Sequence, residues 1–327
     1  MTGASGHLGN NLIRMLSKTG KKVIAGVRQP VTSEILKGVN CEIVYTDVLD
    51  RASLEKAMQG VDILYHCAAV FRHWAPDPQN EIIKANLDGT RNVLETAAKL
   101  GVKKIIYVSS IVALDRNTQP MNEHGWNSDF SNPYNHSKTV SEQLAWEIAG
   151  NLDMFMISVL PAAIVGPHIY GRLTPTMKLL DSIISNASRV DIGFVQNIVD
   201  VHDVAAGMME AADHGHNGKR YILGNEMSIS TTRIFEIAHE LYNEILLPPL
   251  AKKEYLLQYA AGEEAKSLVT GEEPALIRQN VELMYGADIR LDISAARADL
   301  GFAPQSPESA VKDALIHLYS RRKDMSL

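Results

Sequence analysis

The sequence predicts an α/β protein with a doubly wound parallel sheet, followed by a smaller, mostly helical second domain. Over the first two-thirds of the chain, strands that are apolar throughout alternate with helical segments. This pattern is typical of a parallel sheet covered by helices on both faces. A glycine-rich turn opens the first helix, and the regular alternation ends after Gly166. The chain has 327 residues, of which 46% are hydrophobic and 21% are charged. That length suits about two domains of roughly 150 residues each.

The expected elements follow one another along the chain. Buried strands are expected at 22–27, 42–45, 63–66, 104–108 and 154–160. The helices between them include one from Asp50 or Ser53 to Met58 and a long one that ends near Gly101. After Gly166, we expect helices at 174–184 and 205–212 and short strands at 197–201 and 221–223. Helices and loops fill the remaining chain.

The glycine-rich turn, T-G-A-S-G-H-L-G at 2–9, has glycines at positions 3, 6 and 9 and leads directly into a helix. Glycines allow the backbone to turn sharply and to approach a pyrophosphate, whose charge then lies at the helix N-terminus. The alternative is an ordinary glycine-rich turn. The residues expected to contact a dinucleotide here are Gly3, Ser5, Gly6, His7, Leu8 and Gly9.

A strand is missing in front of this turn. Such a turn follows a buried strand, yet only Met1 precedes Thr2. Five buried apolar side chains at about 2 kcal/mol each would contribute about 10 kcal/mol, which is comparable to the stability of a whole domain. We therefore expect an empty central slot in the sheet of the printed chain. We also expect the natural protein to begin several residues upstream.

Two charged residues follow the next strands. Arg28 directly follows the strand at 22–27. An acidic residue there would bind a ribose 2′-hydroxyl, whereas an arginine accommodates a 2′-phosphate. Arg28 therefore favours NADP over NAD, unless it is simply a solvated loop residue. Asp47, followed by Val48, is placed either to contact the adenine edge or to cap a helix.

Proton-transfer chemistry is suggested by a tyrosine and a lysine at one helix start. The Asn-Pro pair at 132–133 is typical of a helix N-terminus. Tyr134 and Lys138 are four residues apart and share one face of that helix. A phenol has a pKa near 10, and a neighbouring ammonium group lowers it. Ser109 and Ser110 end an apolar strand, where a hydroxyl either donates to a substrate carbonyl or caps the strand end.

These motifs together resemble the extended short-chain dehydrogenases/reductases, which have a Rossmann-type fold and belong to the NAD-dependent epimerase/dehydratase superfamily. The resemblance covers nearly the whole chain. It is carried by 2–9, H-C-A-A at 66–69, N-L-D-G-T at 86–90, V-S-S at 108–110, Tyr134 with Lys138, P-A-A-I-V-G-P at 161–167, V-H-D-V-A at 201–205, R-Y-I-L-G at 220–224 and L-G-F-A-P at 300–304.

The resemblance implies a role for each matching residue. Tyr134 would be the general acid/base, and Lys138 would bind the ribose and lower the pKa of the tyrosine. Ser110 would orient the substrate carbonyl, with Ser109 as the alternative, and Asn86 would support the active site. The cofactor would also be lined by Ala68 and Ala69 and approached by the backbone of Pro161, Ala163 and Ile164.

The resemblance also implies a division of the chain. Residues 1–165 would form the dinucleotide-binding domain, to which 190–225 return. Residues 166–189 and 226–327 would bind the substrate.

Two enzymatic functions compete within this family. Nucleotide-sugar epimerases and dehydratases usually carry an arginine and an asparagine where this chain has Leu160 and Ala163. The run at 160–167 resembles instead the dihydroflavonol-reductase-like branch. We therefore expect an NADP-dependent reductase of an aldehyde or ketone, with a nucleotide-sugar epimerase or dehydratase that holds NAD tightly as the alternative. A redox-sensing NADP-binding module is a third interpretation, and the Tyr134/Lys138 pair speaks against it.

Composition argues against other partners. The net charge is −6 without a basic block, which disfavours nucleic acid, and the longest apolar runs are too short for a membrane span. With no evident signal peptide and only two cysteines, we expect a cytoplasmic protein with a small-molecule carbonyl or sugar substrate and no metal site. A homodimer is compatible with the sequence. The loop at His73 and Trp74 either overhangs the substrate or packs on the surface.

Overall fold

A parallel sheet forms the centre of the protein, as expected. The structure is a computed structural model that describes residues 1–29, 35–167 and 173–325. Strands β3 (Ile63–His66), β4 (Lys104–Val108), β5 (Met156–Pro161) and β9 (Arg220–Leu223) pair in that order, all parallel. Strands β1 (Ile24–Val27) and β2 (Glu42–Tyr45) form a second parallel pair. The apolar side chains of β1, β3, β4, β5 and β9 are largely buried between two layers of helices. The expectation of a buried strand at 42–45 is wrong, because β2 pairs only with β1 among the described strands and leaves Ile43 and Tyr45 exposed.

Residues 1–4 lie in the slot between β1 and β3 that the sequence appeared to leave empty. The Met1 amino group donates to the Ile24 carbonyl (2.8 Å), and the Gly26 N–H donates to the Met1 carbonyl (2.8 Å). On the other side, the Thr2 N–H donates to the Tyr65 carbonyl (3.1 Å). The expectation of an empty slot is therefore wrong for the part of the slot next to the glycine-rich turn. One or two residues suffice there to form hydrogen bonds with both neighbouring strands, β1 and β3. The combined order, β2-β1-(1–4)-β3-β4-β5-β9, is the doubly wound order of a Rossmann-type sheet.

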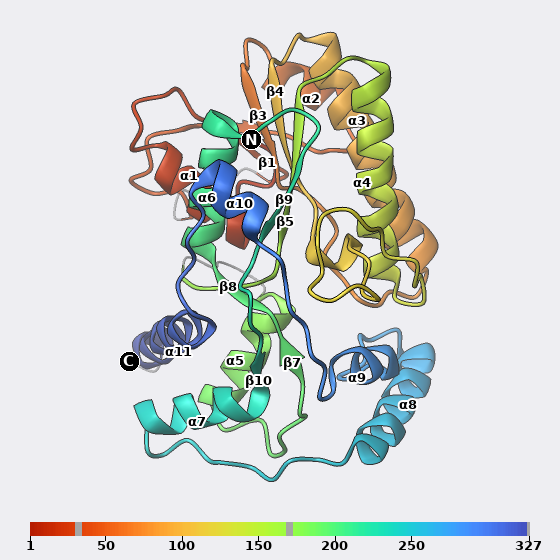
Figure 1. The fold of residues 1–327 in the computed structure, drawn as a ribbon, viewed down its shortest axis with the longest axis vertical. Coiled ribbons are helices and arrows are strands. Elements are labelled where there is room, and N and C mark those ends of the chain that lie inside the picture. Colours follow the sequence, from red (N-terminus) through yellow and green to blue (C-terminus); the bar gives the residue numbers. More distant parts are fainter. Residues whose placement is uncertain (30–34, 168–172, 326–327) are drawn as a thin grey trace.

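Helices cover both faces of the sheet (Figure 1). One layer contains α1 (His7–Leu16), α6 (Val201–His214) and α10 (Ser294–Leu300), and the other contains α2 (Arg51–Ala57), α3 (Ala85–Lys99) and α4 (Pro133–Asn151). Because α10 packs on α6 and β9, residues close to the end of the chain belong to the core of the sheet. The sequence predicts these elements well, although α6 begins at Val201, directly after a strand that ends at Asp200, whose side chain caps the helix.

The remaining elements lie at the end of the molecule away from the four-stranded sheet (Figure 1). They are the helices α5 (Pro175–Ile184), α7 (Thr231–Leu241), α8 (Lys253–Thr270), α9 (Arg278–Met284) and α11 (Pro307–Met325), with the short strands β6 (Ala163–Val165), β7 (Val195–Gln196), β8 (Ile198–Asp200) and β10 (Ile229–Ser230). Strand β6 pairs with β8 in parallel, and β7 pairs with β10 antiparallel. The short π-helix η1 (Gln79–Lys84) precedes α3, and the 3₁₀ turn η2 (Ile111–Ala113) follows β4. No helix in the described ranges is long and apolar enough to cross a membrane.

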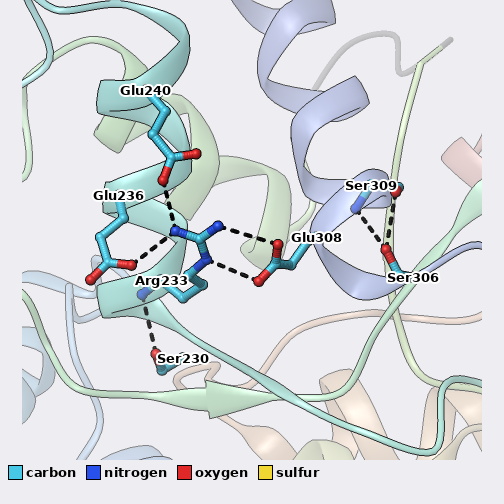
Figure 2. A network of polar contacts seen from close by, with 7 residues as sticks. All are labelled: Ser230, Arg233, Glu236, Glu240, Ser306, Glu308 and Ser309. Carbon is cyan, nitrogen blue, oxygen red and sulfur yellow. Dashed lines mark hydrogen bonds and ion pairs between the residues drawn. The ribbon is translucent and has the colours of Figure 1, made fainter.

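A surface network joins two of these helices. Figure 2 shows Arg233 of α7 between Glu236 and Glu240 on its own helix and Glu308 at the start of α11. These carboxylates raise the pKa of the Arg233 guanidinium. Because the carboxylates are exposed, each ion pair contributes little on its own. The network orients α11 against α7, while the buried side chains between the helices provide most of the stability.

An extension at the amino terminus tests the importance of the central slot. We expect that adding roughly six to eight apolar-rich residues, a common strand length, before Met1 will raise both the melting temperature and the affinity for NADPH. The added residues would extend the ladders to β1 and β3 and cover the hollow beside Met1. A glycine/serine extension of equal length is the control. Equal melting temperatures for the two extensions would contradict the expectation.

Candidate cofactor and active site

The carboxyl ends of the strands open into one large cavity of about 1690 Å³. A typical small-ligand pocket measures about 300–1000 Å³, so this cavity has room for a dinucleotide and a substrate together. Every site residue that the sequence predicts lies in its wall. These residues are Gly3, Ser5, Gly6, His7, Leu8, Gly9, Arg28, Asp47, Val48, Ala68, Ala69, Asn86, Ser110, Tyr134, Lys138, Pro161, Ala163 and Ile164.

The glycine-rich turn closes tightly at the start of α1. Gly3 has a φ of +71°, and a Cβ atom there would lie 2.8 Å from the Ala68 nitrogen. A Cβ on Gly9 would lie 2.1 Å from the Gly3 carbonyl oxygen. Gly6 precedes α1 without any side-chain cap, so the amide groups of the first turn remain available at the cavity. This cradle fits a pyrophosphate group.

His7 connects this turn to the chain that follows β6. Its Nε2 atom lies 3.0 Å from the Gly166 carbonyl oxygen and 3.1 Å from that of Pro167. Burial lowers the pKa of His7 to about 4, so the ring is neutral at pH 7 and donates from Nε2. The contact holds the turn at 2–9 close to the segment at 161–167.

The two charged residues after β1 and β2 lie at the edge of the cavity. Arg28 is exposed there. The Asp47 carboxylate accepts from the Leu49 N–H (2.9 Å), whereas α2 is capped by Asp50, which accepts from the Ala52 and Ser53 N–H groups. The helix-capping alternative for Asp47 is therefore wrong, and its side chain remains beside the cavity.

The start of α4 presents Tyr134 and Lys138 to the cavity. Asn132 caps the helix by accepting from the Tyr134 N–H (3.0 Å), as the sequence predicts. Burial raises the pKa of Tyr134 to about 12, against the opposing effect of a hydrogen bond with Ser110. The Lys138 ammonium donates to the Val108 carbonyl (2.8 Å), and burial lowers its pKa to about 8. The expected lowering of the tyrosine pKa by Lys138 is not seen in this structure, so the phenol is protonated at neutral pH.

The two neighbouring serines have different partners. The Ser109 hydroxyl donates to Glu142 (2.6 Å) in the interior. The Ser110 hydroxyl accepts from the Val112 N–H (3.4 Å), lines the cavity together with Tyr134, and lowers the pKa of that phenol. Of the two, Ser110 is therefore the one whose hydroxyl adjoins the phenol.

Asn86, on α3, connects the loop after β3 to α4. Its side-chain oxygen accepts from the Val70 N–H (2.7 Å), and its Nδ2 donates to the Val70 carbonyl (3.1 Å) and to the Ser137 hydroxyl (3.0 Å). Ser137 lies between Tyr134 and Lys138 on α4. Asn86 thus fixes the turn of helix that carries both residues.

Aromatic side chains from the loop after β3 pack against Tyr134. The ring centroids of Phe71 and His73 lie 4.8 and 5.0 Å from that of Tyr134. Both residues line the cavity, which supports the interpretation that the His73 loop overhangs it. Sequence reasoning did not single out Phe71, whose only signal is its position shortly after the H-C-A-A motif.

Behind the serines, a buried ion pair joins α4 to β9. Arg220 contacts both carboxylate oxygens of Glu142 (2.9 Å each), and the Glu142 side chain is fully buried. Arg220 also donates to the carbonyls of Glu123 and Gly125 and stacks on the Trp126 ring at 4.0 Å. The sequence analysis missed this pair. Its available signal was Glu142, four residues after Lys138 and on the same helical face.

Comparison with known proteins places the chain in a family. The model of the "NAD dependent epimerase/dehydratase family" matches residues 1–224 of the chain. The chain is 31% identical over 323 residues to sterol demethylase protein B of Methylococcus capsulatus, with 96% of each chain covered. It is 28% identical to cinnamoyl-CoA reductase CAD2 of Medicago truncatula, with 82% of this chain and 89% of that protein covered.

The chain belongs to the NAD-dependent epimerase/dehydratase family. Its relatives also include a putative dihydroflavonol 4-reductase of Synechocystis sp., and within this family the chain is an extended short-chain dehydrogenase/reductase of the dihydroflavonol-reductase-like type, an NAD(P)-dependent enzyme. The crystal structure of gox2253 has a TM-score of 0.81 and 31% identity to it and covers 98% of this chain and 97% of that one. In the described part of the chain, no group of three or more histidine, cysteine, aspartate or glutamate side chains is arranged to hold a metal ion.

Breaking the buried ion pair between Arg220 and Glu142 tests how much it contributes to the stability of the fold. We expect Arg220→Met to lower the free energy of unfolding by about 3–5 kcal/mol, because it leaves the Glu142 charge buried and unpaired. The double variant Glu142→Leu/Arg220→Met should recover much of this loss. Chemical denaturation measures both, and the exposed Arg297→Met is the matched control, expected to change stability by at most about 1 kcal/mol. A loss for Arg220→Met as small as that of the control would contradict the expectation.

Proposed function

We propose that this chain is an NADP-dependent reductase that converts an aldehyde or ketone into an alcohol. The observation that carries the proposal is the placement of Ser110 and Tyr134 in one cavity wall, with Lys138 one helical turn from Tyr134 on α4. A nicotinamide cofactor bound in the cavity would supply the hydride. Ser110 would polarise the carbonyl oxygen, and Tyr134 would donate the proton to it.

The residues of the cradle fit such a cofactor. We assign the pyrophosphate to the turn at 2–9 and the adenosine 2′-phosphate to Arg28. The adenine edge is assigned to Asp47 and Val48. Lys138 would bind the ribose, while Ala68, Ala69, Pro161, Ala163 and Ile164 would line the nicotinamide. This assignment makes 1–165 with 190–225 the cofactor-binding part, and 166–189 with 226–327 the substrate-binding part.

The part of the cavity that is not assigned to the cofactor is suited to a bulky apolar substrate. Its wall includes Phe194, Phe235, Tyr255 and Tyr259. An aromatic wall of this kind favours an apolar ring system or chain over a sugar. Leu160 and Ala163, which stand where epimerases usually have arginine and asparagine, also favour the reductase over the nucleotide-sugar alternative.

A screen separates the two enzymatic alternatives. NADPH oxidation would be followed with apolar aldehydes, ketones and nucleotide sugars, and the denatured protein would be analysed for released cofactor. The proposal expects turnover of an apolar carbonyl compound and exchangeable NADPH. Tightly retained NAD, together with conversion of a nucleotide sugar, would support the epimerase instead.

Removing the phenolic proton tests the role of Tyr134. We expect Tyr134→Phe to lower kcat by at least about a hundredfold, because the ring is kept while the proton donor is lost. Binding of NADPH should barely change. Tyr285→Phe, which removes a hydroxyl bonded to the Ala251 carbonyl instead, is the matched control. Activity of Tyr134→Phe within a few-fold of the parent would show that another group donates the proton.

Substitution of Arg28 tests the choice of cofactor. We expect Arg28→Ala to weaken NADPH binding by about 1.5–3 kcal/mol, the range for a hydrogen bond to a charged group, and to leave NADH binding nearly unchanged. Titration calorimetry with both cofactors measures this. Arg51→Ala, an exposed arginine paired with Glu95, is the control. Equal losses for both cofactors would show a structural role, and an unchanged NADPH affinity would show that Arg28 is merely solvated.

A further inference from the structure

The wall of the cavity contains a cation, Arg116, for which the described residues provide no salt bridge. Arg116 follows η2 and is only partly exposed. Its Nη2 group donates to the Leu283 carbonyl of α9 (3.2 Å). A guanidinium has five N–H donors, and the described residues provide no ion pair for this one. Burial accordingly lowers the pKa of Arg116.

The other cations of the substrate side differ from it. Arg72 pairs with Glu81 and Lys178 with Glu273, each at 3.8 Å. Arg189 is exposed to solvent. Arg116 therefore combines partial burial with the lack of an ion pair, and a charge in that situation is costly unless a ligand supplies the counter-charge.

Asp129 is the acidic group whose charge raises the pKa of Arg116, and it acts from a longer distance than a salt bridge. One of its oxygens accepts from the Ser131 N–H and hydroxyl, and the other accepts from Gln279 of α9. Both oxygens of the Asp129 carboxylate are thus already used by hydrogen bonds to residues other than Arg116. The remaining donors of Arg116 thus keep their capacity for an anion in the cavity.

Helix α9 places Arg116 close to the reacting end of the cavity. The Leu283 carbonyl of α9 accepts a hydrogen bond from Arg116. The Asn280 side chain of the same helix accepts one from Asn132, the residue that caps the helix of Tyr134. Three residues along a helix correspond to about 4.5 Å. One turn of α9 therefore separates the Arg116 contact from the contact at the start of α4. The wall of the same cavity also contains the apolar residues Met121, Ile277 and Ile289.

We propose that Arg116 is an anion-binding residue of the substrate site, and that the substrate is an apolar carbonyl compound that also carries a carboxylate. A single planar guanidinium matches the two oxygens of a carboxylate. A diphosphate would need several cations held at one place, whereas Arg72 and Lys178 are paired with glutamates and Arg189 is exposed to solvent. The carbonyl part of this proposal rests on the proposed reductase function, whereas the anion site does not.

A matched pair of probes tests the anion site. The probes are 4-oxo-4-phenylbutanoate and its methyl ester, which differ in the charge of one end. Binding to the NADP⁺-saturated protein would be measured by titration calorimetry, and reduction would be measured by NADPH oxidation. We expect the parent to bind the acid at least about tenfold more tightly than the ester, as for a charge-assisted contact. Arg116→Met should lose this preference while it keeps its affinity for the ester, and Arg116→Lys should keep part of it.

Controls and contrary outcomes separate this proposal from the reductase function. Arg297→Met, outside the cavity, should bind both probes like the parent, and thermal melting would confirm that each variant is folded. The anion site is overturned if the parent binds the acid no better than the ester, binds neither probe, or if folded Arg116→Met keeps the preference for the acid. Preferential binding of the acid without NADPH oxidation would support the anion site and count against the reductase. Reduction of the acid and the ester with equal efficiency would support the reductase function and count against the anion site.

Discussion

The hydrogen bonds of residues 1–4 to β1 and β3 are the constraint on which the site depends. They join β1 and β2 to the four-stranded sheet, since no other described strand lies between them. They also fix the start of the glycine-rich turn, because the N–H of Ala4, within that turn, donates to the Gly26 carbonyl (3.2 Å). The Thr2 hydroxyl adds a contact of 2.7 Å to His66. The position of the cradle relative to the ends of the strands is thus set by a very short piece of backbone.

Helix α4 organises the other side of the cavity. It carries Tyr134 and Lys138 and is held by Asn86 at Ser137 and by Arg220 at Glu142. Because these anchors lie on different elements, α3 and β9, the helix is fixed along its length rather than at one end. The side chains that face the cavity are therefore supported by polar contacts from two directions.

Most of the architecture could be predicted from the sequence, because apolar strands, helix caps and glycine turns are local signals. The Asn-Pro start of α4 and the glycine turn are of this kind, and all the predicted site residues line one cavity. Contacts between distant segments were not predictable in this way. The partner of Ser109, the ring of Phe71 on Tyr134 and the lone cation at Arg116 depend on which elements meet in three dimensions. The occupation of the slot by Met1 and Thr2 was missed because a full strand seemed necessary.

The Glu142–Arg220 pair has a consequence for how this family can diversify. Neither residue can be replaced alone without a buried charge, so the two positions are expected to change together or not at all during evolution. They lie 78 positions apart in the chain, on helix α4 and on the edge strand β9. A correlated substitution at this distance would report the packing of β9 against α4 in any relative, even where the cavity itself has been remodelled for a different substrate.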